Sequence, residues 1–228
     1  MTTRRVNLNT ESVDNYLKAI FTLGGIEEER VTSTALAERL GVAPASTTNM
    51  LQKLASASPP LVQYERHKGV RLATAGRRRA LEIVRHHRLL EAFLYEVLDY
   101  PIEEVHDEAE RLEHFISERL EERIDVKLGR PKFDPHGHCI PEMDGRMPKQ
   151  VSKPLTDIEQ DGKFLVDSVS DQDPLLLKQL KAHGISPGAR LQVTNPSQEE
   201  FILRAGNNSK ALRLSRTLAG AVRIRTAN

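Results

Sequence analysis

The chain has 228 residues and a formal net charge of +1 at pH 7, and its length predicts two or three small domains. No run approaches the roughly 18 apolar residues of a membrane span, and the opening MTTRRVNLNT lacks the apolar core of a signal peptide. A single cysteine, Cys139, excludes an internal disulfide framework and predicts a reducing, cytoplasmic setting.

The small net charge is unevenly distributed along the chain. Residues 1–90 contain fourteen Lys and Arg against eight Asp and Glu, whereas residues 99–125 contain three against eleven. A basic first segment suits a polyanion, and an acidic second segment suits a cation. From charge alone, two ordinary solvated faces remain an equal alternative.

The first segment predicts a winged helix-turn-helix domain. We expect helices over residues 14–23, 32–40 and 44–55 and short strands over residues 61–64 and 70–73. Gly41 ends the middle helix, and Pro44 is suited to open the next one because its missing N–H costs nothing there. The two strands form a hairpin with a basic tip at His67 and Lys68. Helix, glycine-containing turn, helix and basic hairpin are the order of a winged helix-turn-helix.

The third helix of this domain is expected to enter the major groove of DNA. Its candidates for exposed contacts with DNA are Ala43, Ala45, Ser46, Thr47, Thr48 and Asn49. Phosphate contacts are expected from Lys53, Arg66, Lys68 and Arg71. Winged helices also mediate protein contacts, and the basic wing together with Arg77, Arg78 and Arg79 favours DNA over that alternative.

The next segment predicts two helices, which we expect over residues 76–98 and 101–127. The second has apolar residues at helical spacing, namely Val105, Ala109, Leu112 and Ile116. Four potential metal ligands follow at i, i+4, i+7 and i+8 and share one face of that helix: His106, Glu110, Glu113 and His114. The preceding helix adds His87 and Glu91, one turn apart.

Histidines and carboxylates from adjacent helices are typical ligands of a divalent transition metal. One alternative is an acidic helix with an occasional histidine. Another is a hydrolytic metalloenzyme, but the sequence contains no obvious separate general base, and that interpretation leaves the helix-turn-helix unexplained.

The remainder of the chain changes character. Residues 129–154 are rich in Pro, Gly and His and predict a connector, in which His136, His138 and Cys139 are more readily loop residues than an extra metal site. A helix is expected over residues 174–183, a turn at Asn207 and Asn208, and strands over residues 162–169, 189–194, 200–204, 210–214 and 221–225. This pattern predicts a small β-barrel of SH3 size.

The predicted fold is therefore mainly α with a small β domain. We expect a winged helix DNA-binding domain at residues 1–78, a metal-binding and dimerisation domain at 79–145, a linker at 146–160 and an SH3-like domain at 161–228.

Several motifs give the sequence a specific resemblance. LGVAPASTTNMLQKL, TAGRRRALEIVRHHRLLEAFL, VHDEAERLEHFISERL and PKFDPHGHCIP occur in the order found in the diphtheria toxin repressor family of iron- and manganese-dependent regulators, which the chain resembles over essentially its whole length. The resemblance implies a homodimer that binds two divalent cations per subunit and then a palindromic operator in double-stranded DNA.

The resemblance also implies two ligand sets. One site matches His87, Glu91 and His106. The other matches Glu110, Glu113 and His114, together with a ligand from the first helix. Glu110 stands where manganese-responsive members have glutamate and iron-responsive members have cysteine, and a hard carboxylate suits Mn²⁺.

The resemblance implies two further ligands. One comes from the first helix, where this chain departs from the family pattern, and the other comes from a loop whose alignment with the family leaves two aspartates as candidates. The first-helix position, a Met or Asp in the family, aligns with Asn15, and Asp14 or water are the alternatives there. Lys18, a carboxylate in some short manganese regulators, cannot coordinate a metal as an ammonium ion. The SH3-like domain contributes Asp171 as the best match, with Asp173 second.

The sequence as a whole predicts a metal-dependent repressor, with Mn²⁺ expected and Fe²⁺ close behind. The alternatives are an iron-responsive repressor, a metal-independent winged-helix regulator, a metal-dependent activator and a metalloenzyme.

Overall fold

The computed structural model describes residues 10–25, 28–148, 150–194, 200–206 and 211–227. The chain divides into two compact units, Met1–His86 with Pro141–Met147, and His87–Ile140 with Pro148–Asn228. The division falls inside the long helix α4, Thr74–Leu98. Among the described residues, no helix is both long enough and apolar enough to cross a membrane.

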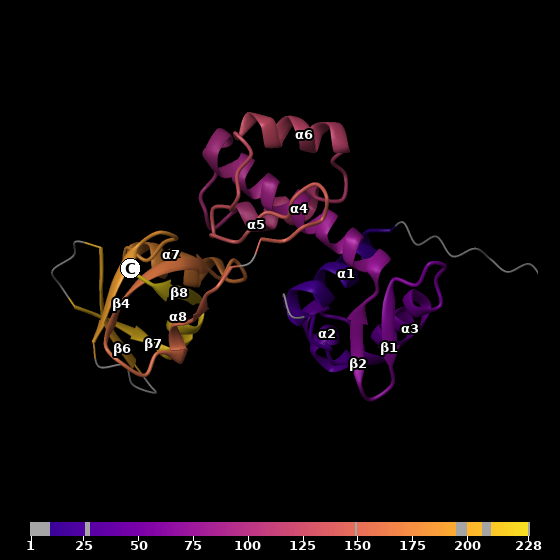
Figure 1. Cartoon of the computed structure of the whole chain (residues 1–228), viewed down its shortest axis with the longest axis horizontal. Coiled ribbons are helices and arrows are strands. Elements are labelled where there is room, and N and C mark those ends of the chain that lie inside the picture. The colour runs from indigo at the N-terminus through magenta and orange to yellow at the C-terminus, as the bar shows by residue number, and fades with distance from the viewer. Residues whose placement is uncertain (1–9, 26–27, 149, 195–199, 207–210, 228) are drawn as a thin grey trace, which may run out of the picture. The chain divides into compact units, whose positions relative to one another are not determined.

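The first unit has the predicted winged helix-turn-helix architecture (Figure 1). Its elements before α4 are α1 (Glu11–Gly24), α2 (Ser33–Leu40), α3 (Pro44–Ala55), β1 (Val62–Glu65) and β2 (Gly69–Leu72). The hydroxyls of Thr10 and Thr32 cap the first two helices by accepting hydrogen bonds from Val13 N and Ala35 N. Gly41 ends α2 in the left-handed conformation, as predicted.

Buried apolar side chains of α1, α2 and α3 form one core with the strands and the start of α4. Its fully buried members include Val13, Leu17, Leu36, Leu51, Leu54, Val70 and Ala80. This core fixes α3, the helix predicted to enter the major groove, against the rest of the unit.

The helical part of the second unit corrects one prediction. The single helix expected over residues 101–127 is instead two helices, α5 (Val105–Leu112) and α6 (Glu118–Lys127). Ser117 is the physical reason, because its hydroxyl accepts a hydrogen bond from Leu120 N and so caps a new helix. Ile116 therefore lies beyond α5, and Glu113 is the C-cap of α5 rather than a residue inside a continuous helix.

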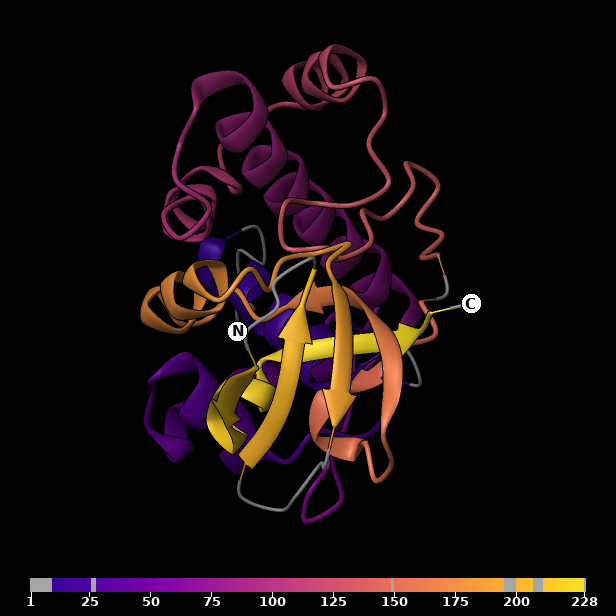
Figure 2. The same cartoon turned by 90° about the vertical axis from the view of Figure 1, so that its left-hand side faces the viewer.

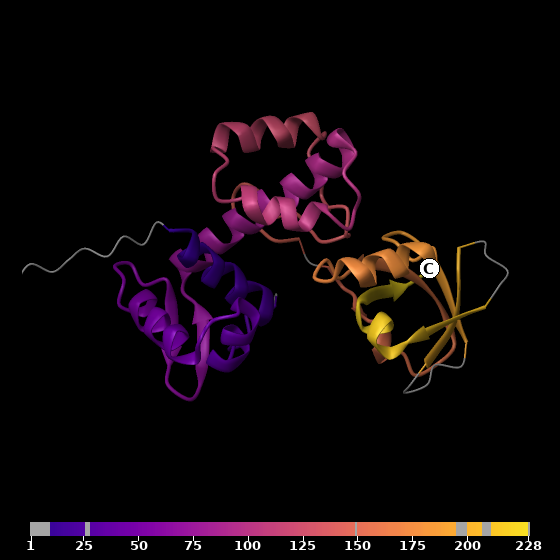
Figure 3. The same cartoon turned by 180° about the vertical axis from the view of Figure 1, so that it is seen from behind.

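The rest of the second unit is a small β domain (Figure 2). Its elements are β3 (Lys153–Pro154), the short 3-10 helix η1 (Leu155–Asp157), β4 (Gly162–Val169), α7 (Pro174–Ala182), β5 (Arg190–Thr194), β6 (Glu200–Ala205), β7 (Leu212–Ser215), α8 (Arg216–Gly220) and β8 (Val222–Thr226). The strands form one antiparallel sheet in the order β3-β8-β4-β5-β6-β7. α8 packs against β7 and β8 (Figure 3).

The expected strands and helix of this domain are confirmed to within two residues at their described ends. β3, η1 and α8 were not predicted, and β3 and η1 lie within the stretch that was expected to be a linker. The turn predicted at Asn207 and Asn208 lies outside the described residues. The strand residues that alternate inward form the core, including Val166, Leu191, Val193, Phe201, Leu203, Leu214 and Ile224.

Candidate metal centre and DNA-binding face

Four predicted metal ligands of the second unit converge on one point. His87 and Glu91 lie one turn apart on α4, His106 lies on α5, and Asp171 follows β4, and one ligand atom from each lies within 4.8 Å of all the others. His87 Nε2 is 3.0 Å from Glu91 Oε1 and 3.1 Å from His106 Nδ1. His106 Nδ1 is 3.6 Å from Asp171 Oδ2.

The loop between β4 and α7 decides which aspartate reaches this cluster. Asp173 is the N-cap of α7, and its carboxylate accepts hydrogen bonds from Leu175 N and Leu176 N. That role holds Asp173 on its own helix, whereas Asp171, two residues earlier, faces His106. The structure therefore brings Asp171, the better of the two sequence matches, to the cluster.

A second cluster lies on the other side of the His87 ring. His87 Nδ1 is 2.5 Å from Glu113 Oε2 and 3.7 Å from Glu110 Oε2. His114 joins through Glu113, with 3.5 Å between His114 Nε2 and Glu113 Oε1. Glu110 and Glu113 therefore offer ligand atoms within 4.8 Å of His87, which contributes to both clusters through its two ring nitrogens, and His114 adjoins them through Glu113. Sequence spacing gave no sign of this sharing.

The connector brings three further ligand-type side chains to the first cluster. Asp134, His136 and His138 offer ligand atoms within 4.8 Å of one another. His136 Nδ1 is 3.6 Å from Glu91 Oε1, and His138 Nδ1 is 3.8 Å from Asp171 Oδ2. The two histidines were expected to be loop residues, and Asp134 was not predicted as a ligand. Their Asp-x-His-x-His spacing was the available signal.

Glu91 and His136 shift each other's pKa in opposite directions in the centre. Burial alone raises the pKa of Glu91, but the positive charge of His87 and the nearby imidazoles of His106 and His136 outweigh it, so this pKa lies well below its usual value. Burial lowers the pKa of His136, yet Glu91, Asp134 and Asp171 together raise it to about 9. The carboxylates of Asp134 and Asp171 also raise the pKa of His138 against the effect of its burial, so protons on His136 and His138 offset part of the buried negative charge.

The donors present fit a divalent cation. They are imidazole nitrogens and carboxylate oxygens, and metal–ligand distances of about 2.0–2.2 Å place neighbouring ligand atoms about 3 Å apart. The separations of 3.0–3.3 Å among His87, Glu91 and His106 are close to this value. In the described part of the chain, the buried Oε2 of Glu91 also lacks a hydrogen-bond partner. The thiol of Cys139 is not among these donors and lies 3.5 Å from Gln150 Oε1.

Asn15, the first-helix candidate, belongs to α1 in the first unit. Its Oδ1 is buried and has no hydrogen-bond partner among the described residues, which leaves an amide oxygen available to coordinate. Asp14, the alternative, is an ion-pair partner of Arg79.

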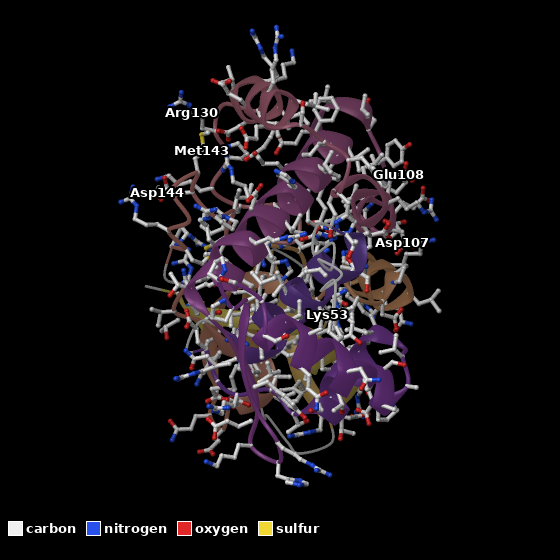
Figure 4. All side chains as sticks on the ribbon, turned by 90° about the vertical axis from the view of Figure 1, so that its right-hand side faces the viewer. Lys53, Asp107, Glu108, Arg130, Met143 and Asp144 are labelled. Carbon is white, nitrogen blue, oxygen red and sulfur yellow. The ribbon has the colours of Figure 1, made fainter. Side chains whose placement is uncertain are left out.

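The DNA-binding face of the first unit is largely exposed, with one correction. Ala43, Ala45, Ser46, Asn49, Arg66 and Lys68 are exposed, and Thr48 and Lys53 are partly so (Lys53 is labelled in Figure 4). Thr47 was expected to be exposed, and that expectation is wrong, because it is completely buried with Tyr16 Oη 3.4 Å from its hydroxyl. Residues 47, 51 and 54 are spaced i, i+4 and i+7, so Thr47 lies on the inner face of α3 with Leu51 and Leu54.

A hollow of about 610 Å³ lies between α2, α3 and the wing. Its lining is polar or small: Thr32, Ser33, Thr34, Pro44, Thr48, Gln52, Tyr64, Arg66, His67 and Gly69. Gly69 allows the wing to close here, because its φ is +88° and a Cβ would meet Val31 O at 2.4 Å. Lys68 pairs with Glu65, whereas Arg66 has no ion-pair partner in the described part of the chain.

Comparison with known proteins assigns each part of the chain. Residues 9–70 match the family described as iron dependent repressor, N-terminal DNA binding domain. Residues 73–142 match its metal binding and dimerisation domain, and residues 153–226 match the FeoA domain.

Similar proteins cover most of the chain. The iron-dependent repressor IdeR of Mycobacterium leprae is 31% identical, covering 94% of this chain and 96% of that protein. A solved manganese-dependent transcriptional repressor in complex with manganese is 37% identical, with a TM-score of 0.87, covering 94% of this chain and 99% of the other. The ScaR structure with bound Zn²⁺ is 28% identical, with a TM-score of 0.79 and coverage of 94% and 99%.

The matched domains indicate operator DNA and a second copy of the chain as partners, and members of this family are repressors rather than enzymes. With its DNA-binding, helical dimerisation and SH3-like β domains in the family's order, this chain belongs to the iron-dependent repressor family and is a metal-dependent, DNA-binding transcriptional repressor.

Proposed function

We propose that the chain is a manganese-responsive repressor that binds two divalent cations per subunit and controls metal homeostasis. The observation that carries this proposal is the convergence of ligand atoms from His87, Glu91, His106 and Asp171 within 4.8 Å. These residues form the first proposed site. In this proposal the chain acts in the cytoplasm, where its operator lies.

The second proposed site consists of Glu110, Glu113 and His114, with Asn15 as the ligand from α1. The placement of Glu113 against His87 Nδ1 supports this assignment, and so does the buried, unpaired Oδ1 of Asn15. A bound dication would neutralise carboxylates that otherwise repel one another. An Asn15 ligand would make the position of α1, and with it the DNA-reading domain, respond to metal.

The donor chemistry supports manganese over iron. All the proposed ligands offer oxygen or imidazole nitrogen, and hard carboxylates such as Glu110 suit Mn²⁺. The solved relative described as manganese-dependent is 37% identical, above the 31% of the iron-dependent relative. Iron is the second candidate, because that relative is named iron-dependent and Fe²⁺ exceeds Mn²⁺ in general affinity order.

The proposed division of labour follows the domains. Residues 1–78 bind DNA, 79–145 bind metal and dimerise, and the proposed linker from residue 146 ends where β3 starts the SH3-like domain at Lys153. Within the first, Ala43, Ala45, Ser46, Thr48 and Asn49 are proposed to face bases, and Lys53, Arg66 and Lys68 to face phosphates. Thr47 would act indirectly, by fixing α3 from within.

An anaerobic titration tests the proposal. Each of Mn²⁺, Fe²⁺, Zn²⁺ and Co²⁺ is added to metal-free protein, the bound metal is counted, and operator affinity is measured at each occupancy. We expect two equivalents per subunit and operator binding that rises with Mn²⁺. Equal operator affinity in chelator would contradict the metal-dependent mechanism, and activation by Fe²⁺ alone would select the iron alternative.

A further inference from the structure

The outer face of the β domain has a basic residue on each of five neighbouring strands. These residues are Lys163 on β4, Arg190 on β5, Arg204 on β6, Arg213 on β7 and Arg225 on β8. All five are exposed, and each alternates along its strand with residues of the core. We call this set the basic sheet face.

Strand pairing places the middle of this face in one row. Lys163 pairs with Gln192, and Gln192 pairs with Arg204, so the three side chains cross β4, β5 and β6 side by side. Arg190 lies two residues from Gln192 on the same strand. With strands about 4.8 Å apart and alternate residues about 6.8 Å apart, Arg190 is a diagonal neighbour of both cations.

Acidic residues balance only the edges of the face. Asp167 lies 3.3 Å from Arg225, and Glu200 lies 3.5 Å from Arg213. Among the described residues, Lys163, Arg190 and Arg204 have no ion-pair partner. Three adjacent like charges disfavour one another, and nothing in the fold of the β domain itself requires them.

The chemistry of the face decides which polyanion it fits. Its outward strand positions include no Phe, Tyr or Trp among the described residues. Protein-binding surfaces are enriched in aromatic anchors, and single-stranded nucleic acid is held by stacking on aromatic rings. Duplex phosphates need neither, because Arg, Lys and Gln side chains contact them directly.

We propose that the basic sheet face is a second DNA contact, in which Lys163, Arg190 and Arg204 bind the phosphate backbone of double-stranded DNA. The inference rests on the chain being a DNA-binding repressor, and it assigns the β domain a part in that binding. Phosphate contacts are independent of base sequence, so this face would add affinity for duplex DNA without adding operator specificity.

The test compares salt dependence of DNA binding in the full-length, manganese-loaded protein. The triple variant Lys163→Gln, Arg190→Gln, Arg204→Gln is matched with Arg119→Gln, Arg123→Gln, Lys127→Gln, which removes the same charge from exposed positions of α6. A third variant, Arg190→Lys with Arg204→Lys, keeps the charge. Each is titrated with a long duplex that contains the operator and with one that lacks it.

We expect the triple variant to reduce the slope of log K against log salt by about 2.7, because each neutralised phosphate contributes about 0.9. The reduction should occur on both duplexes, while the α6 variant and the charge-keeping variant retain the parent slope. The inference is overturned if the triple variant has the same slope of log K against log salt as the parent. The same holds if its oligomeric state changes and the slope does not. Failure of the parent to prefer its operator would count against the proposed function instead, because the duplex without operator still reports on the basic sheet face.

Discussion

The DNA-binding face and the metal centre differ in the exposure of their side chains and in how far apart in the sequence these residues lie. The DNA-binding face is exposed, and its residues lie between Ala43 and Lys68 on two neighbouring elements. In the metal centre Glu91, Glu113 and His136 are each 0% exposed, and the ligand-type residues come from α4, α5, the connector and the β4–α7 loop. A polyanion can be held by side chains that stay solvated, whereas the carboxylates of this centre are buried and their charge must be balanced.

The largest expected effect comes from the buried side of this comparison. Glu113→Gln removes a charge that lies 2.5 Å from His87 Nδ1 and is completely buried. We expect manganese-dependent operator affinity to fall by about 10–100-fold. The measurement is operator binding by fluorescence anisotropy across a Mn²⁺ titration.

Asp107→Asn is the matched control for this change. Asp107 lies on the same helix as the proposed ligands but is exposed (Figure 4). It should retain the parent response. If Glu113→Gln and Asp107→Asn change manganese-dependent operator affinity equally, the effect of Glu113 would not depend on its place in the buried centre.

A second prediction extends the buried centre into the connector. His136 Nε2 donates a hydrogen bond to the carbonyl of Ile102, at 3.1 Å, and this bond holds His136 Nδ1 3.6 Å from Glu91 Oε1, where its charge acts on that carboxylate. We expect His136→Gln to weaken metal binding by about tenfold, as measured by calorimetric titration. His183→Gln, at the end of α7, is the control. An unchanged metal affinity in His136→Gln would show that this residue of the connector does not contribute to the metal centre.

A third prediction concerns the exposed side. Arg66→Gln should lower the salt slope of operator binding by about 0.9, the contribution of one phosphate. Lys68→Gln should lower it by less, because Lys68 Nζ already lies 2.8 Å from Glu65 Oε2. Equal slopes for Arg66→Gln and the parent would exclude this part of the wing from the interface.

The smallest predicted effect lies beneath the DNA-binding face. Tyr16→Phe removes the hydroxyl beside Thr47 Oγ1 and should lower the free energy of unfolding by about 1 kcal/mol. Urea denaturation measures the change. Operator affinity should fall only slightly, and a loss as large as that of Glu113→Gln would show that α3 is positioned mainly through this contact.

The sequence was most informative where structure depends on local signals. Thr32, Gly41 and Pro44 mark helix ends through capping and backbone preference, so the helix-turn-helix was predicted nearly to the residue. The β strands followed from alternation. Thr47 was misjudged because a threonine between exposed residues carries no local sign of burial.

The metal centre was only partly predictable, for a physical reason. The spacing of His87 with Glu91, and of His106 with Glu110, required only a helix. The break at Ser117 and the contributions of Asp134, His136 and His138 depend on packing between segments far apart in the chain. Family resemblance supplied Asp171, but only the N-cap role of Asp173 explains why that aspartate is the one that faces His106.

The position of His87 between the two clusters has a consequence for proton stoichiometry. A neutral imidazole holds one proton, and in the proposed first site Nε2 is the coordinating atom, so that proton must sit on Nδ1, where Glu113 Oε2 accepts it. If Glu113 is then engaged by the second site, this hydrogen bond has to weaken. Filling the two sites should therefore release protons in unequal steps, which repeated titrations in buffers of different ionisation enthalpy would resolve.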